Sequence, residues 1–235
     1  MIPVLVQSGR RSMSTPQSSA AIRTKDTRNE MAQNTQQTPT VFIVDDDPAI
    51  RFAMQALMDS VNLRHEIFGS GDEFLEQISE EHAGCLVLDI RMPGLGGLEL
   101  QEELIKRGNT LPIIFITGHG DVPMAVEAMQ KGAVDFIQKP FRDQDLLDRI
   151  SEGLKTDRER RQEQQEHAEV EERIARLTNR EREVFDLVVT GKPNKVIAYE
   201  LGVSQRTVEI HRARVMEKMR ARSLADLVKM HIHQT

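Results

Sequence analysis

The chain has 235 residues, of which 39% are hydrophobic and 29% charged, and its 31 basic and 37 acidic side chains leave a net charge of −6. These values are typical of a globular protein with one or two domains. A single cysteine excludes a disulfide framework and a thiolate metal site within the chain, and no apolar run approaches the roughly 18 residues that cross a bilayer. We therefore expect a cytoplasmic protein that does not bind membranes.

The charge is distributed unevenly along the chain. Residues 40–154 hold 21 acidic and 9 basic side chains, a net charge of −12, whereas residues 176–235 hold 12 basic and 7 acidic ones, a net charge of +5. An acidic domain is thus joined to a basic one. The acidic balance of the whole chain does not argue against a nucleic-acid partner for the basic domain.

Residues 1–38 are rich in Gln, Ser, Thr and Arg and show little periodicity, which predicts a disordered N-terminal extension. The segment Ile2–Val6 is too short for the apolar core of an export signal. Met31 stands shortly before the first predicted strand, so it is an alternative start of the protein.

Residues 39–157 alternate between short apolar runs and amphipathic segments. We expect strands at Val41–Val44, Leu63–Phe68, Cys85–Asp89, Pro112–Thr117 and Val134–Gln138. A helix is expected after each strand, the fifth beginning near Arg142. Strict alternation with short connections predicts an α/β fold, a doubly wound parallel sheet of five βα units like that of flavodoxin.

The stretch from Cys85 to Gly94 organises this domain. Apolar residues run directly into Asp89, and Met-Pro-Gly then interrupts the chain, so Asp89 is expected at the carboxyl end of a buried strand. In an open parallel sheet the carboxyl ends of neighbouring strands meet at one edge, where ligands bind. Asp45, Asp46, Thr117 and Lys139 are expected at the same edge.

Three carboxylates so close together stay ionised only if positive charge offsets their repulsion. Ligands that are all oxygens favour Mg²⁺ over a transition metal. Lys139 supplies an ammonium group and Thr117 a hydroxyl where a phosphoryl group on Asp89 would need partners. The pattern therefore favours phosphoryl transfer to a carboxylate. The alternative is that these carboxylates only cap helices.

The stretches VDDDPAIR, LVLDIRMPG, IFITGHGD and DFIQKPF occur in this order and resemble the receiver domain of two-component response regulators. The resemblance implies that Mg²⁺ is held by Asp45, Asp46, Asp89 and the main-chain carbonyl of Arg91. It also implies that Asp89 accepts the phosphoryl group.

In receiver domains of this kind, further residues respond to the phosphoryl group. By the same resemblance, Thr117 and Phe136 form the switch pair, and Lys139 is the lysine that contacts the phosphoryl group. An ordinary core aromatic is the alternative for Phe136.

Residues 158–174 are predicted to be a helical linker. The segment is rich in helix formers, but between 155 and 169 no aliphatic side chain larger than alanine appears, which predicts a solvated helix. A coiled coil is the alternative, although its core positions are missing.

Residues 175–235 are predicted to form a small all-α domain of four helices. Thr178 and Glu181 have the spacing of a capping box, Asn194 and Ser204 are expected to cap the second and third helices, and Ser223 begins the fourth. A Gly202-Val203 turn joins the second helix to the third, which is the signature of a helix-turn-helix.

The third helix of this domain has an inward apolar stripe and an outward face that a DNA major groove would contact. The stripe comprises Val208, His211, Val215 and Met219. The candidate DNA-contacting residues are Lys195, Arg206, Thr207, Glu209, Ile210, His211, Arg212, Ala213 and Arg214. The alternative for the arginines is an ordinary solvated basic face.

The stretches LTNREREV, NKVIAYELGVSQRTVEIHRARVMEKM and SLADLVKM resemble the LuxR/FixJ type of DNA-binding domain. The chain from about residue 40 onward is therefore similar to a FixJ-family response regulator. The resemblance implies a sensor histidine kinase as phosphodonor, a homodimer on phosphorylation, double-stranded DNA and RNA polymerase as partners, and activation of transcription. The alternative is a DNA-binding protein that is independent of phosphorylation and uses the first domain only to dimerise.

The alternative from a different functional class is an enzyme, an aspartyl-phosphate hydrolase that acts on small phosphate esters. Such an enzyme needs a second acid two residues after the nucleophile to act as general acid. That position is Arg91, whose guanidinium group cannot donate a proton in this way. We therefore predict that the protein is not an enzyme.

Overall fold

The structure is a computed structural model that describes residues 38–118 and 122–232. The N-terminal extension predicted to be disordered lies outside the described residues, except for Thr38. Within the part that is described, no helix is both long and apolar enough to cross a membrane.

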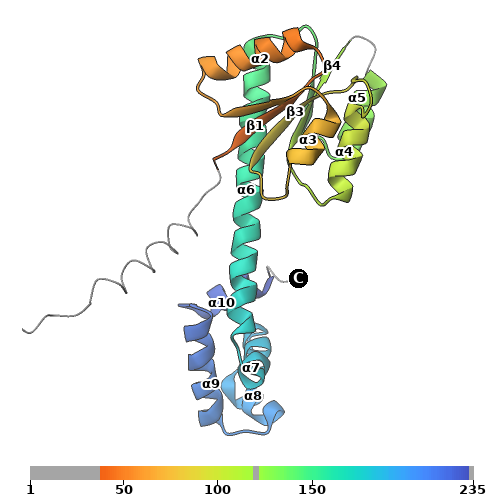
Figure 1. The fold of residues 1–235 in the computed structure, drawn as a ribbon. Coiled ribbons are helices and arrows are strands. Elements are labelled where there is room, and N and C mark those ends of the chain that lie inside the picture. Colours follow the sequence, from red (N-terminus) through yellow and green to blue (C-terminus); the bar gives the residue numbers. More distant parts are fainter. Residues whose placement is uncertain (1–37, 119–121, 233–235) are drawn as a thin grey trace, which may run out of the picture. The chain divides into compact units, whose positions relative to one another are not determined.

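A five-stranded parallel sheet with the order β2-β1-β3-β4-β5 forms the first half of the protein (Figure 1). Its strands are β1 (Thr40–Val44), β2 (His65–Phe68), β3 (Gly84–Asp89), β4 (Ile113–Thr117) and β5 (Asp135–Gln138). Every residue of β1, β3 and β4 is buried, as expected of central strands covered on both faces. The predicted α/β fold and strand positions are confirmed.

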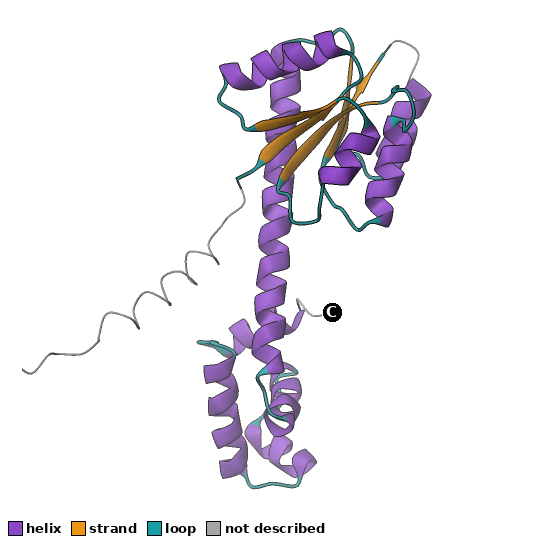
Figure 2. Ribbon diagram, viewed as in Figure 1, coloured by secondary structure: helices purple, strands orange, loops and turns teal. Residues whose placement is uncertain are grey.

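Helices cover both faces of this sheet (Figure 2). They are α2 (Pro48–Ser60), α3 (Gly71–Gln77), α4 (Gly97–Lys106), α5 (Val122–Gln130) and the beginning of α6 (Asp143–Ala175). In β1, Phe42 and Val44 pack with α3, α4 and α5, whereas Val41 and Ile43 pack with α2 and α6. Because side chains alternate along each strand, they contribute to two apolar layers, one on each face of the sheet.

Helix α6 is a single helix of 33 residues. Its first turns pack on the sheet through Leu146 and Ile150, and its last turns enter a separate core through Val170 and Ile174. Between these two parts, residues 162–169 are all exposed. The segment predicted to be a helical linker, residues 158–174, lies within this helix.

The described part of the C-terminal domain contains four helices, as predicted: α7 (Asn179–Val189), α8 (Asn194–Leu201), α9 (Gln205–Lys218) and α10 (Leu224–Ile232). Val184, Phe185, Val208 and Val215 are fully or almost fully buried in its core. Gly202 takes a left-handed conformation with φ of 64° at the end of α8, which allows the tight turn into α9.

One capping prediction is wrong. Pro193, not Asn194, is the N-cap of α8, and it makes no side-chain capping bond. Asn194 is the first helical residue, and its side chain accepts a hydrogen bond from Arg212 at 3.0 Å. The side chain that the local pattern predicts as a cap thus bonds to Arg212, a residue on another helix. The caps expected at Thr178 and Ser204 are present.

Glu181 links the start of α7 to the end of α9. The residue is 2% exposed, and its carboxylate accepts hydrogen bonds from the Thr178 main-chain N–H at 2.9 Å and from the Lys218 ammonium group at 2.5 Å. The hydrogen bond from Lys218, with those from Thr178, lowers the pKa of Glu181 to about 2. Because the pKa is lower in the folded state, this contribution to stability is present above about pH 4.5 and is lost as the pH falls towards 2.

We predict that Glu181→Gln lowers the free energy of unfolding of the C-terminal domain by about 1–2 kcal/mol at pH 7, since a charged hydrogen bond is lost. The difference from wild type shrinks at pH 3. Urea denaturation followed by circular dichroism at both pH values measures it, with the exposed neighbour Glu183→Gln as control. A difference that is the same at both pH values would contradict this account.

Candidate functional site

The acidic pocket lies at the carboxyl ends of β1, β3, β4 and β5. Asp89 is the last residue of β3, and Asp45 directly follows β1. Carboxylate oxygens of Asp45, Asp46 and Asp89 all lie within 4.8 Å of one another. The parallel topology therefore brings these three acids together, as expected from the sequence.

Lys139 bridges two of the three carboxylates. Its Nζ atom lies 3.0 Å from Asp45 Oδ2 and 3.1 Å from Asp89 Oδ1. The lysine follows β5 directly, its main-chain N–H donates to the carbonyl of Thr117 at 2.8 Å, and a cis peptide bond joins it to Pro140. Residues more than ninety positions apart in the chain thus form one ionic cluster.

Burial and charge act in opposite directions on this cluster. Asp45 and Asp89 are 1% and 8% exposed. Burial raises the pKa of Asp89, the hydrogen bond and charge of Lys139 lower it in part, and the charges of Asp45 and Asp46 raise it again, so the net shift is upward. Burial lowers the pKa of Lys139, but the hydrogen bonds to Asp45 and Asp89 outweigh it and the net shift is also upward. One lysine therefore compensates the three acids only partly.

This donor set fits a hard divalent cation. Among the described residues, the ligands grouped here are all carboxylate oxygens, which are the ligands that Mg²⁺ prefers. Asp46 is exposed, so it reaches the pocket from the solvent side and leaves room for the waters that Mg²⁺ retains. The cation would supply the charge that Lys139 alone does not.

The loop between β1 and α2 is held by its own hydrogen bonds. Asp45 Oδ1 accepts from the main-chain N–H of Asp47 at 2.9 Å, and Asp47 in turn caps α2 by accepting from Ala49 at 2.8 Å. Arg51 donates to the main-chain carbonyl of Asp45 at 2.7 Å. Sequence reasoning missed Arg51, which ends the stretch VDDDPAIR and fixes the backbone that carries the acid pair.

The remaining predicted pocket residues lie near this edge in different environments. Thr117 ends β4 and is 3% exposed, whereas the Phe136 side chain on β5 is 36% exposed. Arg91 lies two residues after β3 and is exposed. The functions assigned to these three residues depend on a bound metal ion or phosphoryl group, so they stay predictions.

Helix α9 has the two faces that its sequence predicts. Val208, Val215 and Met219 are 0% exposed, and His211 is half-buried. The opposite face is exposed and comprises Arg206, Glu209, Ile210, Ala213 and Arg214. The Arg206 side chain is 83% exposed and lies 3.7 Å from Glu209.

The three residues predicted to contact DNA phosphates differ in exposure and in their hydrogen bonds within the protein. Lys195 is exposed at the start of α8. Arg212 is half-buried and bonded to Asn194, and the hydroxyl of Thr207 lies 2.8 Å from that of Ser204. Sequence reasoning did not find the bond between Arg212 and Asn194, since helical periodicity shows which side a residue faces but not its partner on another helix.

Known proteins resemble the chain over both parts. Residues 41–151 match the response regulator receiver domain, and residues 175–231 match the luxR family of bacterial regulatory proteins. Nodulation protein W of Bradyrhizobium diazoefficiens is 50% identical over 190 residues, which are 81% of this chain and 84% of that protein. The transcriptional regulatory protein FixJ of Azorhizobium caulinodans is 46% identical over 81% of this chain and 90% of its own.

A solved structure of the response regulator StyR is 46% identical and matches with a TM-score of 0.76, covering 83% of this chain and 98% of its own. A receiver domain followed by a luxR-type DNA-binding domain defines a two-component response regulator that regulates transcription. This chain belongs to the NarL/FixJ family of these regulators.

We predict that Lys139→Met lowers the free energy of unfolding by about 2–3 kcal/mol without divalent cations, because it leaves buried carboxylates unpaired, although the lysine is 25% exposed. Adding Asp89→Asn recovers part of the loss by removing one of the repelling charges. Urea denaturation in EDTA of the wild type, the two single mutants and the double mutant measures the coupling energy between the two side chains.

Lys131→Met is the matched control, since Lys131 pairs with Glu102 at 2.7 Å and Glu127 at 2.6 Å on the surface. Its effect is expected to be much smaller. If the two mutations at the pocket are additive, Lys139 and Asp89 are not electrostatically coupled.

Proposed function

We propose that phosphorylation of Asp89 by a partner histidine kinase controls this regulator, and that the phosphorylated form dimerises, binds DNA and activates transcription. The observation that carries the proposal is the ionic cluster of Lys139, Asp45 and Asp89. It is placed at the edge of the sheet where a phosphoryl group on Asp89 would meet an ammonium group and a cation.

The reaction is an in-line transfer to the Asp89 carboxylate. A carboxylate oxygen forms the bond to phosphorus, the bond from phosphorus to the imidazole nitrogen of the donor breaks, and the released imidazole takes a proton from solvent. Mg²⁺ would be held by Asp45, Asp46, Asp89 and the main-chain carbonyl of Arg91, and it would offset charge on the phosphoryl oxygens. Lys139 contributes a second positive charge from the other side.

The new dianionic group would then accept hydrogen bonds from the residues around it. In our proposal the Thr117 hydroxyl and the Lys139 ammonium group donate to the phosphoryl oxygens. Movement of Thr117 leaves space into which Phe136, now partly exposed, turns. The surface formed by residues 123–138 becomes the dimer face, and dimerisation pairs two α9 helices on a two-fold DNA site. RNA polymerase is the partner through which the bound dimer would activate transcription.

Phosphorylation has to change the free-energy difference between the inactive and active states by a large amount. Changing a two-state equilibrium from 1:99 to 99:1 takes about 5.5 kcal/mol. The charge-assisted hydrogen bonds to Thr117 and Lys139 and the burial of Phe136 together have to supply a difference of this order between the two states. A receiver that only dimerises, without this control, would show no response to a phosphodonor.

We predict that a small phosphodonor with Mg²⁺ converts the wild-type protein to dimers and tightens binding to promoter DNA, whereas Asp89→Asn shows neither change. Sedimentation velocity and fluorescence anisotropy at a fixed salt concentration measure the two responses. Asp47→Asn is the control, because this exposed cap neighbours the acid pair and Asn also caps helices. Equal DNA binding by wild type and Asp89→Asn, with or without donor, would support the phosphorylation-independent alternative.

We also predict that Arg206→Ala and Arg214→Ala each weaken specific DNA binding about tenfold, since each side chain lies on the exposed face of α9. Lys195→Ala weakens specific and nonspecific binding alike and lowers the salt dependence. Arg222→Ala, also basic and exposed in the same domain, serves as the control. Unchanged affinity of both α9 variants would show that this face does not contact DNA.

A further inference from the structure

Asp157 is a buried carboxylate at the point where helix α6 leaves the sheet. It is 2% exposed and lies one turn after Gly153, which packs against Cys85 and Ile114. Asp157 Oδ2 accepts a hydrogen bond from the main-chain N–H of Gly84 at 2.8 Å. The helix is therefore bonded to the first residue of β3, at the opposite end of the strand from Asp89.

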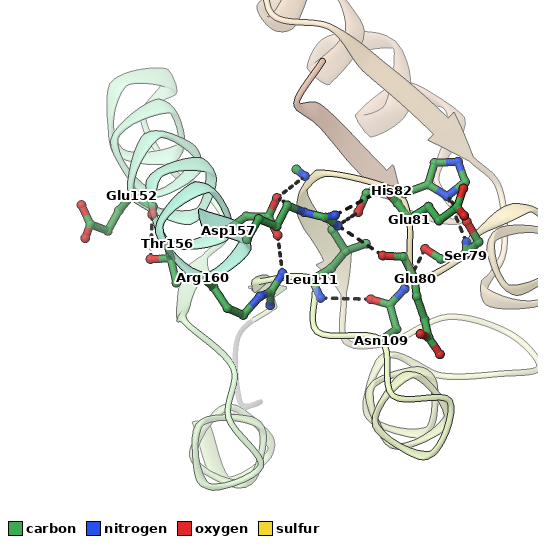
Figure 3. Close-up of polar contacts among 12 residues, drawn as sticks. Ser79, Glu80, Glu81, His82, Asn109, Leu111, Glu152, Thr156, Asp157 and Arg160 are labelled. Atoms are coloured by element: carbon green, nitrogen blue, oxygen red, sulfur yellow. Dashed lines mark hydrogen bonds and ion pairs between the residues drawn. The ribbon is translucent and has the colours of Figure 1, made fainter. Parts of the chain in front are cut away.

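Two arginines on the next turn complete the cluster around Asp157. Arg161 Nε donates to Asp157 Oδ2 at 2.9 Å, and Arg160 Nη2 donates to Oδ1. The same Arg161 guanidinium reaches the loop before β3, where it donates to the carbonyls of His82, Glu80 and Glu81. Figure 3 shows Asp157 and Arg160 on the helix facing the loop that carries Glu80, Glu81 and His82.

The loop that receives these bonds is itself held in place. Gly84 has φ of 141°, and a side-chain carbon there would lie 1.8 Å from the carbonyl oxygen of Thr40, so only glycine fits this close approach to β1. Asn109 donates to the carbonyl of Ser79 at 3.2 Å, and His82 Nδ1 accepts from the Ser79 main-chain N–H at 3.0 Å (Figure 3). Asp157 and Arg161 therefore bind a closely packed, hydrogen-bonded edge of the receiver domain.

Beyond this cluster, the next buried residue of α6 is Val170, which belongs to the core of the C-terminal domain. The apolar contacts of α6 with the sheet end at Leu154, and residues 162–169 are exposed. A polar helical segment of this length is only marginally stable in water by itself. The bonds of Asp157 and Arg161 extend the attachment of α6 by two turns past its apolar contacts.

We propose that Asp157 and Arg161 form a clamp that keeps α6 helical and rigidly attached beyond the receiver core, and that this clamp sets how strongly receiver dimerisation increases DNA affinity. The second part rests on the proposed function. When two DNA-binding domains are joined through a dimer, the gain in affinity depends on their effective concentration at the two half-sites. A connection of fixed direction gives a higher effective concentration than a flexible one, provided that its geometry matches the DNA.

Both residues are positioning residues in this proposal. They lie at the opposite end of β3 from Asp89 and on a different helix from the DNA-contact candidates of α9, so in this proposal they act through α6 and not by contact with the phosphoryl group or DNA. Loss of the clamp should leave phosphorylation and donor-induced dimerisation as in wild type, whereas the DNA affinity of the dimer falls. A purely structural contribution to receiver stability would not separate these two measurements.

The test compares Arg161→Gln with Arg158→Gln, an exposed arginine on the same helix that serves as the control. Asp157→Asn is the second variant, since its amide oxygen can still accept from Gly84 if Arg161→Gln should fold poorly. Hydrogen exchange of peptides covering residues 152–170 is measured without a donor. Dimerisation and DNA affinity are then measured with a small phosphodonor and Mg²⁺.

We expect exchange in this segment to be about tenfold faster in Arg161→Gln and Asp157→Asn, with the control unchanged. The donor-dependent gain in DNA affinity should fall about tenfold, while dimerisation is unaffected. Unchanged exchange in both variants overturns the clamp. Faster exchange with a wild-type gain in DNA affinity overturns its effect on coupling. A wild-type protein that gains no affinity with the donor overturns the proposed function itself, and exchange alone then decides whether the clamp holds the helix.

Discussion

Repulsion between buried carboxylates at the edge of the sheet is the main constraint on the first half of this protein. A parallel sheet brings the carboxyl ends of β1 and β3 together, and both end in acids that are almost fully buried. Carboxylates in such a place are unfavourable unless they are paired. Lys139 reaches two of them, and it can do so because β5 ends on the same edge. The chemistry of a site that is only partly neutralised in this way suits a hard divalent cation.

Strand β3 connects two polar clusters of different character. At its carboxyl end, Asp89 belongs to a cluster that is left incompletely neutralised and is partly open to solvent. At its amino end, Gly84 donates to Asp157, whose carboxylate also accepts from Arg160 and Arg161. Both oxygens of the Asp157 carboxylate accept hydrogen bonds, which favours rigidity, whereas incomplete neutralisation around Asp89 favours binding of a cation. The same strand thus carries a site suited to chemistry and a site suited to attachment.

Local patterns were sufficient to predict most elements of the fold. Burial on both faces makes β1, β3 and β4 continuous apolar runs, and the caps at Thr178 and Ser204 depend on residues only three positions apart. The acidic pocket could also be foreseen, because alternation of strands and helices leaves few topologies and places Asp45, Asp89 and Lys139 at one edge. Its details were less accessible: Arg51 binds a main-chain carbonyl, and no residue pattern specifies that contact.

What the sequence could not show is pairing between distant segments of polar character. Asn194 was assigned to a cap by its type and place, yet Arg212, 18 residues later, takes its side chain. Asp157 is separated from Gly84 by 73 residues and stands in a run of charged helix formers, where a solvated carboxylate is the usual outcome. Periodicity reports which face of a helix is apolar, so it has no means of detecting a buried charge that is stabilised by main-chain groups.

The middle of α6 illustrates how such contacts extend local order. Residues 162–169 make the helix through propensity and through pairs such as Gln162 with Glu166, which add little stability each. In our proposal their order depends on the two ends, where Asp157 and Arg161 bind the receiver and where Val170 and Ile174 join the C-terminal core. Because one end is polar and the other apolar, they respond differently to conditions. Salt screens a buried ionic attachment only weakly, but removal of one charged partner leaves the other uncompensated. The polar end is for this reason the point at which a single side chain has most influence on the whole helix.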